Sequence, residues 1–287
     1  MTAWLVLGAG YTGLRLARAL VARGDDVAIT RRAAADAARD AAAIGGVRGL
    51  ACDLAAPASI AAALATLPAG AIVVVAAPPI DERGTGETAL AVAAAHAGVA
   101  RIVYLSSTGV YAPAAGAWVD EDFALAPTTA AGRARLAAER ALAAGPVPCV
   151  RLRVAGIHGP GRGVIARLAA GSYRLIGDGD TQVSRIHVDD LVTAILAAGD
   201  ASAPGPVYNV ADDQPCTSRE LALAAAAALG LPPPATVPLA GVDAEVAGML
   251  TADRRIDNRR LVRELGVTLR HPSWRTSLGS ARSEGPT

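Results

Sequence analysis

A glycine-rich segment near the start of the chain has the spacing of a phosphate-binding turn. It reads GAGYTG and places glycine at positions 8, 10 and 13. In such a turn Gly8 permits a tight bend, Gly10 lets the backbone approach a pyrophosphate, and Gly13 lets the next helix pack closely on the preceding strand. Tyr11 and Thr12 lie in the same loop, close to the phosphates. A helix that starts here offers free N–H groups and a positive dipole to an anion.

A hydroxyl-rich segment, SSTGVY at residues 106–111, is the second candidate for chemistry. Ser107 and Thr108 follow an apolar run of strand character, where a hydroxyl can hold a substrate oxygen. The alternative is a strand-end serine that hydrogen-bonds to backbone. The chain contains no lysine, because its 27 basic residues are all arginine. The sequence therefore lacks the amine that usually completes a dinucleotide-dependent site, and arginine, which stays protonated, cannot act as a general base in its place.

Two arginines after the second expected strand bear on the choice of cofactor. NAD-binding proteins usually place an acidic residue at this point on the ribose 2′-OH, whereas this chain has Arg31 and Arg32. Guanidinium groups suit a 2′-phosphate, so NADP is predicted, with NAD as the alternative if both arginines are merely solvated. Asp53, at the end of the third strand, is expected near the adenine amino group or is a plain strand-end residue. Ala76 and Ala77, at the end of the fourth strand, are expected to line the same site.

Hydrophobic periodicity places these candidates on an α/β fold. Apolar strand-like runs alternate with helical segments of roughly ten to seventeen residues through the first half of the chain. This alternation predicts a doubly wound parallel sheet of Rossmann type. Ligands on such sheets bind outside the carboxyl ends of the strands. The expected strands are residues 3–7, 27–30, 47–52, 71–77, 101–106 and 149–155.

After residue 156 the pattern becomes irregular and predicts a smaller, mostly C-terminal α/β lobe that binds the substrate. A glycine-rich loop (156–163) and a short helix come first, followed by a hairpin-like segment (173–179). A helix from about Val188 and a strand at 207–210 follow, and the Pro-rich residues 231–238 are expected to be a linker. The predicted division is a dinucleotide-binding domain of residues 1–155, with contributions from about 184–212, and a substrate lobe of residues 156–183 and 213–287.

Composition excludes several classes of function. The 287 residues are 52% hydrophobic and carry a net charge of +1, and the arginines are scattered, so no nucleic-acid partner is expected. The uncharged stretch 54–80 is broken by proline and glycine, so no membrane span is expected. The N-terminus lacks the pattern of a signal peptide. Cys52, Cys149 and Cys216 have no metal-ligand spacing, which favours buried thiols in the cytoplasm and predicts no metal site.

Five motifs in order resemble those of the extended short-chain dehydrogenase/reductase family of NAD(P)-dependent epimerases, dehydratases and reductases. The resemblance covers almost the whole chain and implies a Ser or Thr that holds the substrate oxygen, here Ser107. It also implies a Tyr that exchanges a proton and a Lys, four residues later, that lowers the pKa of that Tyr. The motifs are GAGYTG, SSTGVY, LRVAGIHGPG (152–161), RIHVDDL (185–191) and YNVADDQPCTSREL (208–221).

The chain departs from this family where the Tyr-x-x-x-Lys pair should stand. Aligning the family's Lys-x-x-x-Glu on Arg135 and Glu139 puts Ala131 in place of the Tyr. The segment is similar to an atypical bacterial branch that reads Thr-x-x-Gly-Arg, here Thr129 to Arg133. Since residues two apart on a helix point to different sides, at most one of the two arginines faces the cofactor. Arg133 is the first choice and Arg135 the second, and a solvated Arg or an Arg135–Glu139 pair is the alternative.

Two further departures lie in the loop after the strand at 149–155. Gly156 replaces an Asn of the family and His158 replaces a Tyr, which puts the usual substrate contacts there in doubt. His158 is expected either to titrate near neutrality and transfer a proton or to be a satisfied loop residue. His187 with Asp189 and Asp190 could suggest a metal site, but the resemblance implies a structural element there.

These features together predict an atypical NAD(P)-dependent oxidoreductase or epimerase acting on a small molecule. Four arginines of the smaller lobe favour an anionic or sugar-nucleotide substrate, because guanidinium groups bind phosphates and carboxylates well. They are Arg162, Arg167, Arg174 and Arg185. The alternative is a catalytically silent NADP(H)-binding sensor or scaffold. A homodimer is left open, since many relatives pair through their helices.

Overall fold

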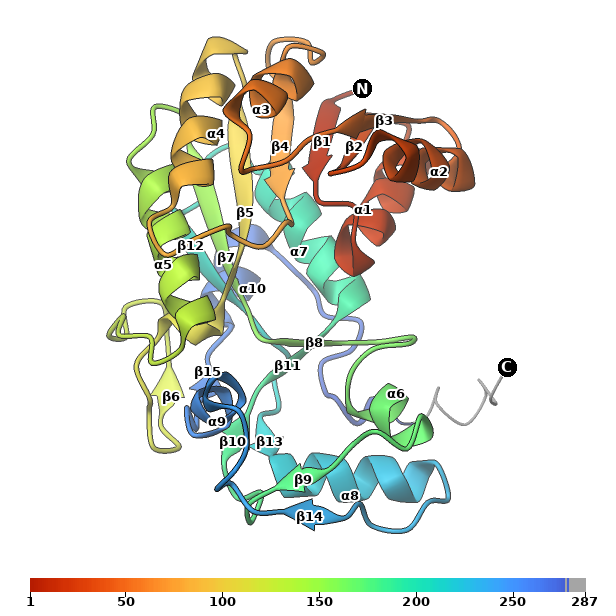
Figure 1. Ribbon diagram of the computed structural model, residues 1–287, viewed down its shortest axis with the longest axis vertical. Helices are drawn as coiled ribbons and strands as arrows, with labels where there is room; N and C mark the ends of the chain where they lie inside the picture. The colour runs from red at the N-terminus through yellow and green to blue at the C-terminus, as the bar shows by residue number, and fades with distance from the viewer. Residues whose placement is uncertain (277, 279–287) are drawn as a thin grey trace.

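The computed structural model describes residues 1–276 and 278. Its centre is a seven-stranded parallel sheet in the order β12-β7-β5-β4-β1-β2-β3 (Figure 1). The predicted doubly wound α/β fold is therefore confirmed, and the expected strand ends differ from the observed ones by only one or two residues. The strands are β1 (Ala3–Leu7), β2 (Asp26–Arg31), β3 (Val47–Ala51), β4 (Ile72–Val75), β5 (Arg101–Ser107), β7 (Cys149–Val154) and β12 (Val207–Val210).

Helices cover both faces of this sheet, which is why its strands are apolar on both sides. Side chains of four helices form one hydrophobic core with one face, and side chains of three helices form a second core with the other. The first set is α1 (Tyr11–Ala22), α2 (Ala34–Ile44), α7 (Val188–Asp200) and α10 (Arg259–Leu265). The second set is α3 (Pro57–Leu64), α4 (Thr85–His96) and α5 (Ala130–Ala143).

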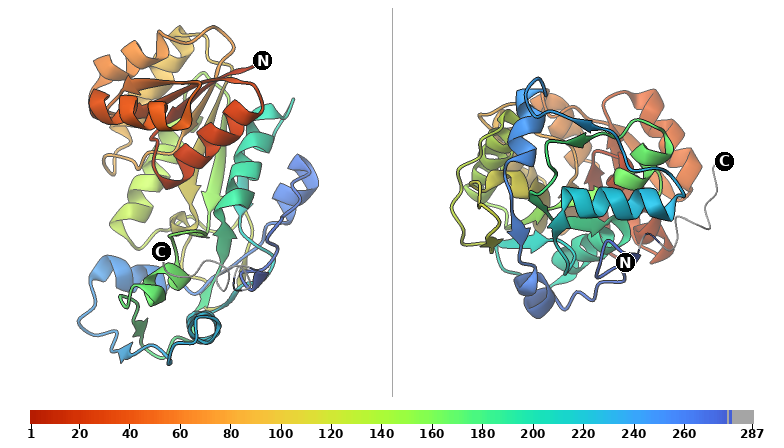
Figure 2. Two further views of the ribbon diagram at one scale, coloured as in Figure 1. Left: turned by 90° about the vertical axis from the view of Figure 1, so that its right-hand side faces the viewer. Right: turned by 90° about the horizontal axis from the view of Figure 1, so that it is seen from below.

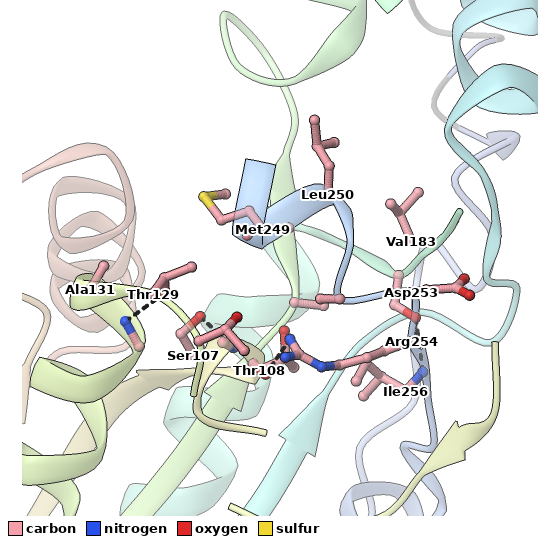
Figure 3. A pocket seen from close by; sticks show the side chains of 18 of the residues that line it. Ser107, Thr108, Thr129, Ala131, Val183, Met249, Leu250, Asp253, Arg254 and Ile256 are labelled. Atoms are coloured by element: carbon pink, nitrogen blue, oxygen red, sulfur yellow. Dashed lines mark hydrogen bonds between the residues drawn. The ribbon is translucent and has the colours of Figure 1, made fainter. Parts of the chain in front are cut away.

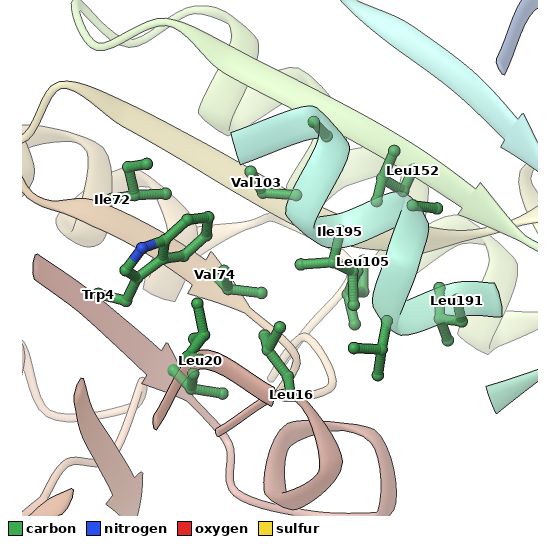
Figure 4. Packing of buried hydrophobic residues seen from close by; sticks show 14 of the residues in the cluster. Trp4, Leu16, Leu20, Ile72, Val74, Val103, Leu105, Leu152, Leu191 and Ile195 are labelled. Atoms are coloured by element: carbon green, nitrogen blue, oxygen red, sulfur yellow. The ribbon is translucent and has the colours of Figure 1, made fainter. Parts of the chain in front are cut away.

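The first core is built around Trp4, a fully buried residue of β1. Its indole lies among Leu16 and Leu20 of α1 and Ile195 of α7 (Figure 4). Gly199 near the end of α7 makes this packing possible, because a Cβ there would lie 2.1 Å from the indole ring. Helix α7 can therefore approach the sheet closely.

The smaller lobe, residues 156–183 and 213–256, lies beyond the carboxyl ends of the sheet strands (Figures 1 and 2). Short strand pairs join it: β11 with β8, β10 with β13, and β9 with β14. Its elements and the adjoining β11 are β8 (Gly156–His158), α6 (Val164–Ala169), β9 (Leu175–Ile176), β10 (Gln182–Val183), β11 (Arg185–His187), β13 (Cys216–Thr217), α8 (Ser218–Ala228), β14 (Thr236–Val237) and α9 (Ala244–Leu250).

Two expectations for this lobe were wrong. Residues 173–179 do not form a hairpin, because β9 pairs in parallel with β14, a distant strand. The Pro-rich segment 231–238 supplies that strand and is more than a linker. Glycines 177 and 179 are compatible with a tight turn beside β9, but β9 pairs with a segment far along the chain.

Two segments cross the predicted division between the domains. β6 (Trp118–Val119), which follows the 3-10 turn η1 (Thr108–Val110), pairs with β15 (Arg255–Ile256). Leu261 of α10 returns to the core of the large sheet. The two lobes are therefore tied together by the β6–β15 pair and by α10.

Within the described residues, no helix combines the length and the apolar character that crossing a bilayer requires. Cys52, Cys149 and Cys216 are free thiols. Burial raises the pKa of Cys149 and of Cys216 to about 12, so both stay protonated at neutral pH.

Candidate functional site

The GAGYTG turn joins β1 to α1 and has room for glycine alone at two of its three positions. Gly8 has a φ of 97°, and a Cβ there would lie 2.6 Å from the backbone N of Ala77. A Cβ at Gly13 would lie 2.4 Å from the carbonyl oxygen of Gly8. At Gly10, by contrast, a Cβ would meet no described atom within 4 Å. The turn therefore packs tightly behind Gly8 and Gly13 and opens in front of Gly10.

The N-terminus of α1 is left free for an anion. No side chain of the described residues caps it, and its first turn contains no acidic residue. The N–H groups of Tyr11 and Thr12 lie in this first turn, where a helix has no internal acceptors. The Tyr11 hydroxyl donates to the carbonyl of Pro160 at 3.0 Å, so the glycine-rich loop 156–163 closes beside the turn. These groups fit the pyrophosphate of a dinucleotide.

The two arginines expected to select NADP lie in different surroundings. The Nε of Arg31, the last residue of β2, donates to a carboxylate oxygen of Asp40 at 2.6 Å. Arg32 is exposed. Asp40 therefore engages Arg31, whereas the Arg32 side chain faces solvent.

The remaining predicted cofactor residues follow neighbouring strands. Asp53 lies two residues beyond β3, and its Oδ1 accepts a hydrogen bond from the backbone N of Ala55 at 3.0 Å. The backbone N–H groups of Ala76 and Ala77 both donate to the carbonyl of Leu7, at 2.8 and 2.9 Å. The end of β4 is thereby held against the glycine turn, so these residues share one edge of the sheet.

A cavity of about 390 Å³ lies at the same edge, between the ends of β5 and β7, the start of α5, and the smaller lobe. We call it the strand-end cavity. Figure 3 shows Ser107 and Thr108 facing the start of α5 on one side and the segment 249–256 on the other. Its lining includes Ala131, which the sequence predicts at the family's Tyr position. It also includes four residues predicted to be catalytic, which are Ser107, Thr108, Thr129 and Arg135.

Two of these hydroxyls also make local backbone contacts. The Oγ of Ser107 accepts from the N–H of Gly109 at 3.0 Å, and the Oγ1 of Thr129 caps α5 by accepting from the N–H of Gly132 at 3.0 Å. Each hydroxyl keeps its own proton to donate. Ser107 therefore bonds to backbone and faces the cavity at once, which leaves its expected role as a substrate ligand open as a prediction.

The two arginines of α5 lie in different surroundings. Arg133 forms an exposed ion pair with Glu82 at 2.7 Å, and it is not among the described residues that line the strand-end cavity. Arg135 does line it, and its Nη1 donates to the carbonyl of Leu105 at 2.6 Å. Helix geometry predicts that the two arginines lie on different sides of α5. Which of these sides faces inward is decided by the packing of α5 on β5.

A buried polar network fixes the end of β5 beside this cavity. Arg153 and Glu139, both almost fully buried, form an ion pair at 2.9 Å. The Ser106 hydroxyl donates to Glu139 at 2.5 Å, and the Tyr111 hydroxyl accepts from Arg153 at 3.0 Å. Glu139 thus pairs with Arg153, and the alternative Arg135–Glu139 pair was wrong. The network holds Ser106, and with it the neighbouring Ser107, against β7 and α5.

Two tyrosines and a histidine near this cavity have strongly shifted pKa values, which makes them poor proton carriers at neutral pH. Burial raises the pKa of Tyr104 and of Tyr111 to about 12. Burial, with a contribution from the nearby His187, lowers the pKa of His158 to about 3. The expectation that His158 titrates near neutrality was therefore wrong, because desolvation keeps its imidazole neutral.

His187 and Asp189 come together with His271, and their ligand atoms lie within 4.8 Å of one another. The imidazole rings of His187 and His271 stack with their centroids 3.8 Å apart. The Nδ1 of His187 also accepts from the N–H of Asp189 at 3.2 Å. Asp190 accepts from the N–H groups of Arg270 and His271, at 2.7 and 2.9 Å. This arrangement fits the structural role that the resemblance implied.

The four arginines predicted to bind an anionic substrate make different contacts. Arg162 lies over the Tyr11 ring at 5.2 Å and Arg167 over the Tyr173 ring at 5.0 Å. Arg174 is exposed and donates to backbone carbonyls. Within the described residues, Arg185 is the member of this set that lines the strand-end cavity.

Sequence reasoning missed the residues that α9 and β15 bring to the cavity. Met249 and Leu250 cover it, and Arg254 lies on its wall (Figure 3). Glu245 accepts from the N–H groups at the start of α5, at 2.9 and 3.0 Å, and so ties α9 to that helix. No motif marked this segment, and its pairing with β6 across more than a hundred residues leaves no local signal.

The buried Asp212 predicts a pH dependence of stability. Burial raises the pKa of its carboxyl to about 7, and its Oδ2 has no partner among the described residues. An acid with a raised folded-state pKa stabilises the fold below its unfolded pKa, and this contribution is lost as pH rises through the folded value. We expect Asp212→Asn to match the native protein near pH 4 and to exceed its unfolding free energy by up to about 4 kcal/mol at pH 8, measured by urea denaturation. If the unfolding free energies of the native protein and of Asp212→Asn changed with pH in parallel, this prediction would be contradicted.

The chain is similar in sequence to a known protein family. Residues 4–211 match the family model described as "NAD dependent epimerase/dehydratase family". A Streptomyces sp protein named 3-diazoavenalumate denitrifying reductase is 35% identical over 214 residues, which cover 69% of this chain and 70% of that protein.

Two solved structures extend the similarity to the whole chain. A conserved protein of unknown function from Silicibacter pomeroyi DSS has a TM-score of 0.86 and 34% identity, with all of both chains covered. MoeE5 in complex with UDP-glucose and NAD has a TM-score of 0.78 and 25% identity, covering 98% of this chain and 97% of that one.

Proposed function

The chain belongs to the NAD-dependent epimerase/dehydratase family, and from this premise we propose that it is a pyridine-nucleotide-dependent reductase of a small molecule held in the strand-end cavity. One observation carries the proposal. The glycine turn, which fits a pyrophosphate, and the cavity lined by Ser107 open at the same edge of the sheet. A dinucleotide held at the turn would present its nicotinamide toward that cavity.

Either direction of hydride transfer needs a proton carrier, and Ala131 stands where the family's Tyr would serve as one. We propose the reductive direction, in which a solvent water beside Ala131 would give its proton to the substrate oxygen and leave as hydroxide. A relative named as a reductase supports the same direction.

The residues of this chain have distinct roles in such a reaction. The bound nicotinamide supplies a hydride. The turn at Gly8 to Gly13 holds the phosphates, and the Ser107 hydroxyl donates to the substrate oxygen or other acceptor atom. Arg135, hydrogen-bonded to Leu105, braces the end of β5 and adds positive potential, but it cannot exchange a proton.

The test is titration calorimetry with reduced and oxidised NAD and NADP, followed by a search for substrate-dependent loss of reduced-nicotinamide absorbance. The panel should contain carbonyl compounds and other electrophiles. Ser107→Ala should lower kcat while leaving cofactor affinity unchanged. Tight cofactor binding with no turnover across the panel would instead favour the silent sensor or scaffold.

We further propose that NADP is the preferred cofactor, with Arg32 as the residue that recognises it. Arg32→Ala should weaken NADPH binding by about 10-fold and leave NADH binding unchanged, because one charge-assisted contact to the 2′-phosphate is lost. Arg39→Ala, which removes another exposed arginine on α2, is the control. Tighter binding of NADH than NADPH by the native protein would contradict the preference. The cytoplasmic location and the homodimer stay predictions.

A further inference from the structure

Arg185 is a positive charge without a partner on the wall of the strand-end cavity. Arg185 is half-buried as a whole, and its Nε is fully buried. Its side chain forms no hydrogen bond or ion pair with any residue of the described chain. Burial lowers the pKa of the guanidinium, but an arginine still carries its charge at neutral pH. A buried cation is costly unless an anion accompanies it.

The other two arginines on the cavity wall hydrogen-bond to the protein. Arg254 donates through all three of its guanidinium nitrogens, to the carbonyls of Thr108, Tyr111 and Ala112, and Arg135 donates through Nη1 to the carbonyl of Leu105. Arg254 is thus fully engaged and Arg135 in part. Among the described residues, Arg185 is the cavity guanidinium that makes no hydrogen bond to the protein.

Gly156 makes the position of Arg185 possible. β8 and β11 run side by side with Gly156 opposite Arg185, and a Cβ on Gly156 would lie 2.4 Å from Nη1 and 3.3 Å from Cζ. Any side chain at residue 156 would displace the guanidinium. The glycine that departs from the family pattern and the arginine opposite it thus form one structural unit.

The nearby acidic residue does not neutralise this charge. Asp212 lies close enough to Arg185 for the two to affect each other's pKa, yet they form no ion pair. The rest of the wall near the smaller lobe has an apolar part, formed by Val183, Met249 and Leu250, and a polar part that includes Glu245 and Asp253. Both of these carboxylates accept hydrogen bonds from backbone N–H groups. The cavity thus combines the Arg185 guanidinium with an apolar patch suited to a hydrophobic body.

We propose that Arg185 binds the carboxylate of the substrate, whose apolar body lies against Val183, Met249 and Leu250. This inference rests on the proposed function, since it assigns the substrate class of the same cavity. A planar carboxylate matches the two parallel donors of a guanidinium. The volume of about 390 Å³ is near the lower end for ligand pockets and favours a compact acid over a sugar nucleotide.

The test measures binding of unreactive ligands to the full-length protein, with and without saturating NADPH, by titration calorimetry. The probes are benzoate, cinnamate and hexanoate, with cinnamamide as the neutral match and phenyl phosphate as the alternative anion. We expect at least one carboxylate to bind and cinnamamide to bind more weakly. Arg185→Met should weaken carboxylate binding by about 10- to 150-fold.

Two other variants make the test specific. Gly156→Ala should reproduce the loss by displacing the guanidinium, whereas Arg174→Met, which removes an exposed arginine of the same lobe, should bind as the native protein does. Binding that survives Arg185→Met, preference for phenyl phosphate, or no carboxylate binding would each overturn the inference. Because these probes need no hydride transfer, a failure of the proposed reaction would show separately, as turnover absent despite binding.

Discussion

Replacing Gly10 with glutamate should abolish dinucleotide binding and leave the fold intact. A Cβ at Gly10 meets no described atom within 4 Å, and the φ of −83° suits any residue. The added carboxylate would stand at the helix N-terminus, where the pyrophosphate is expected, and would repel it. We expect affinity for NADPH and NADH to fall at least about 100-fold, which is about 2.7 kcal/mol, by calorimetry. The thermal unfolding midpoint should stay unchanged.

Two further variants separate the charge from the packing. Gly10→Gln should lose less affinity than Gly10→Glu, since it adds bulk without charge. Gly13→Ala should lower both affinity and stability, because its Cβ would lie 2.4 Å from a backbone oxygen. If Gly10→Glu bound the dinucleotide as tightly as the native protein, the glycine turn would not be the phosphate site.

Removing the carboxylate of Glu139 should cause the largest loss of stability. Glu139 and Arg153 are 1% and 3% exposed, and Glu139 accepts from both Arg153 and Ser106. Glu139→Ala leaves the guanidinium of Arg153 buried without its partner, which typically costs about 3–5 kcal/mol. Urea denaturation measures this cost. Because Ser106 also loses its partner, Ser107 should be less well fixed and kcat should fall as well.

The exposed pair Arg133–Glu82 is the matched control, since it involves the same helix and the same kinds of charge. Arg133→Ala should leave the denaturation midpoint unchanged within error, because solvent screens an exposed pair. Equal losses in Glu139→Ala and Arg133→Ala would show that burial does not set the strength of these pairs.

The sequence by itself determined the N-terminal sheet and the phosphate turn. Strand and helix periodicities are local properties, so β1 to β5 and β7 could be placed from the chain alone with errors of at most two residues. The glycines at 8, 10 and 13 were informative for the same reason, because a turn between a strand and a helix involves only neighbouring residues. The order of the strands, by contrast, was read from the structure.

Tertiary structure alone decided which side chains enter the strand-end cavity. The sequence around Arg133 and Arg135 does not show which of the two points into the cavity. The packing of α5 on β5 places Arg135 there. The sequence did not distinguish Arg185 from the other three arginines predicted to bind an anionic substrate. In the structure, the pairing of β11 with β8 places it opposite Gly156. Met249 and Leu250 gave no signal, because they reach the cavity through a strand pair that closes a very long loop. Such contacts depend on the free energy of the whole packed molecule, which no local pattern encodes.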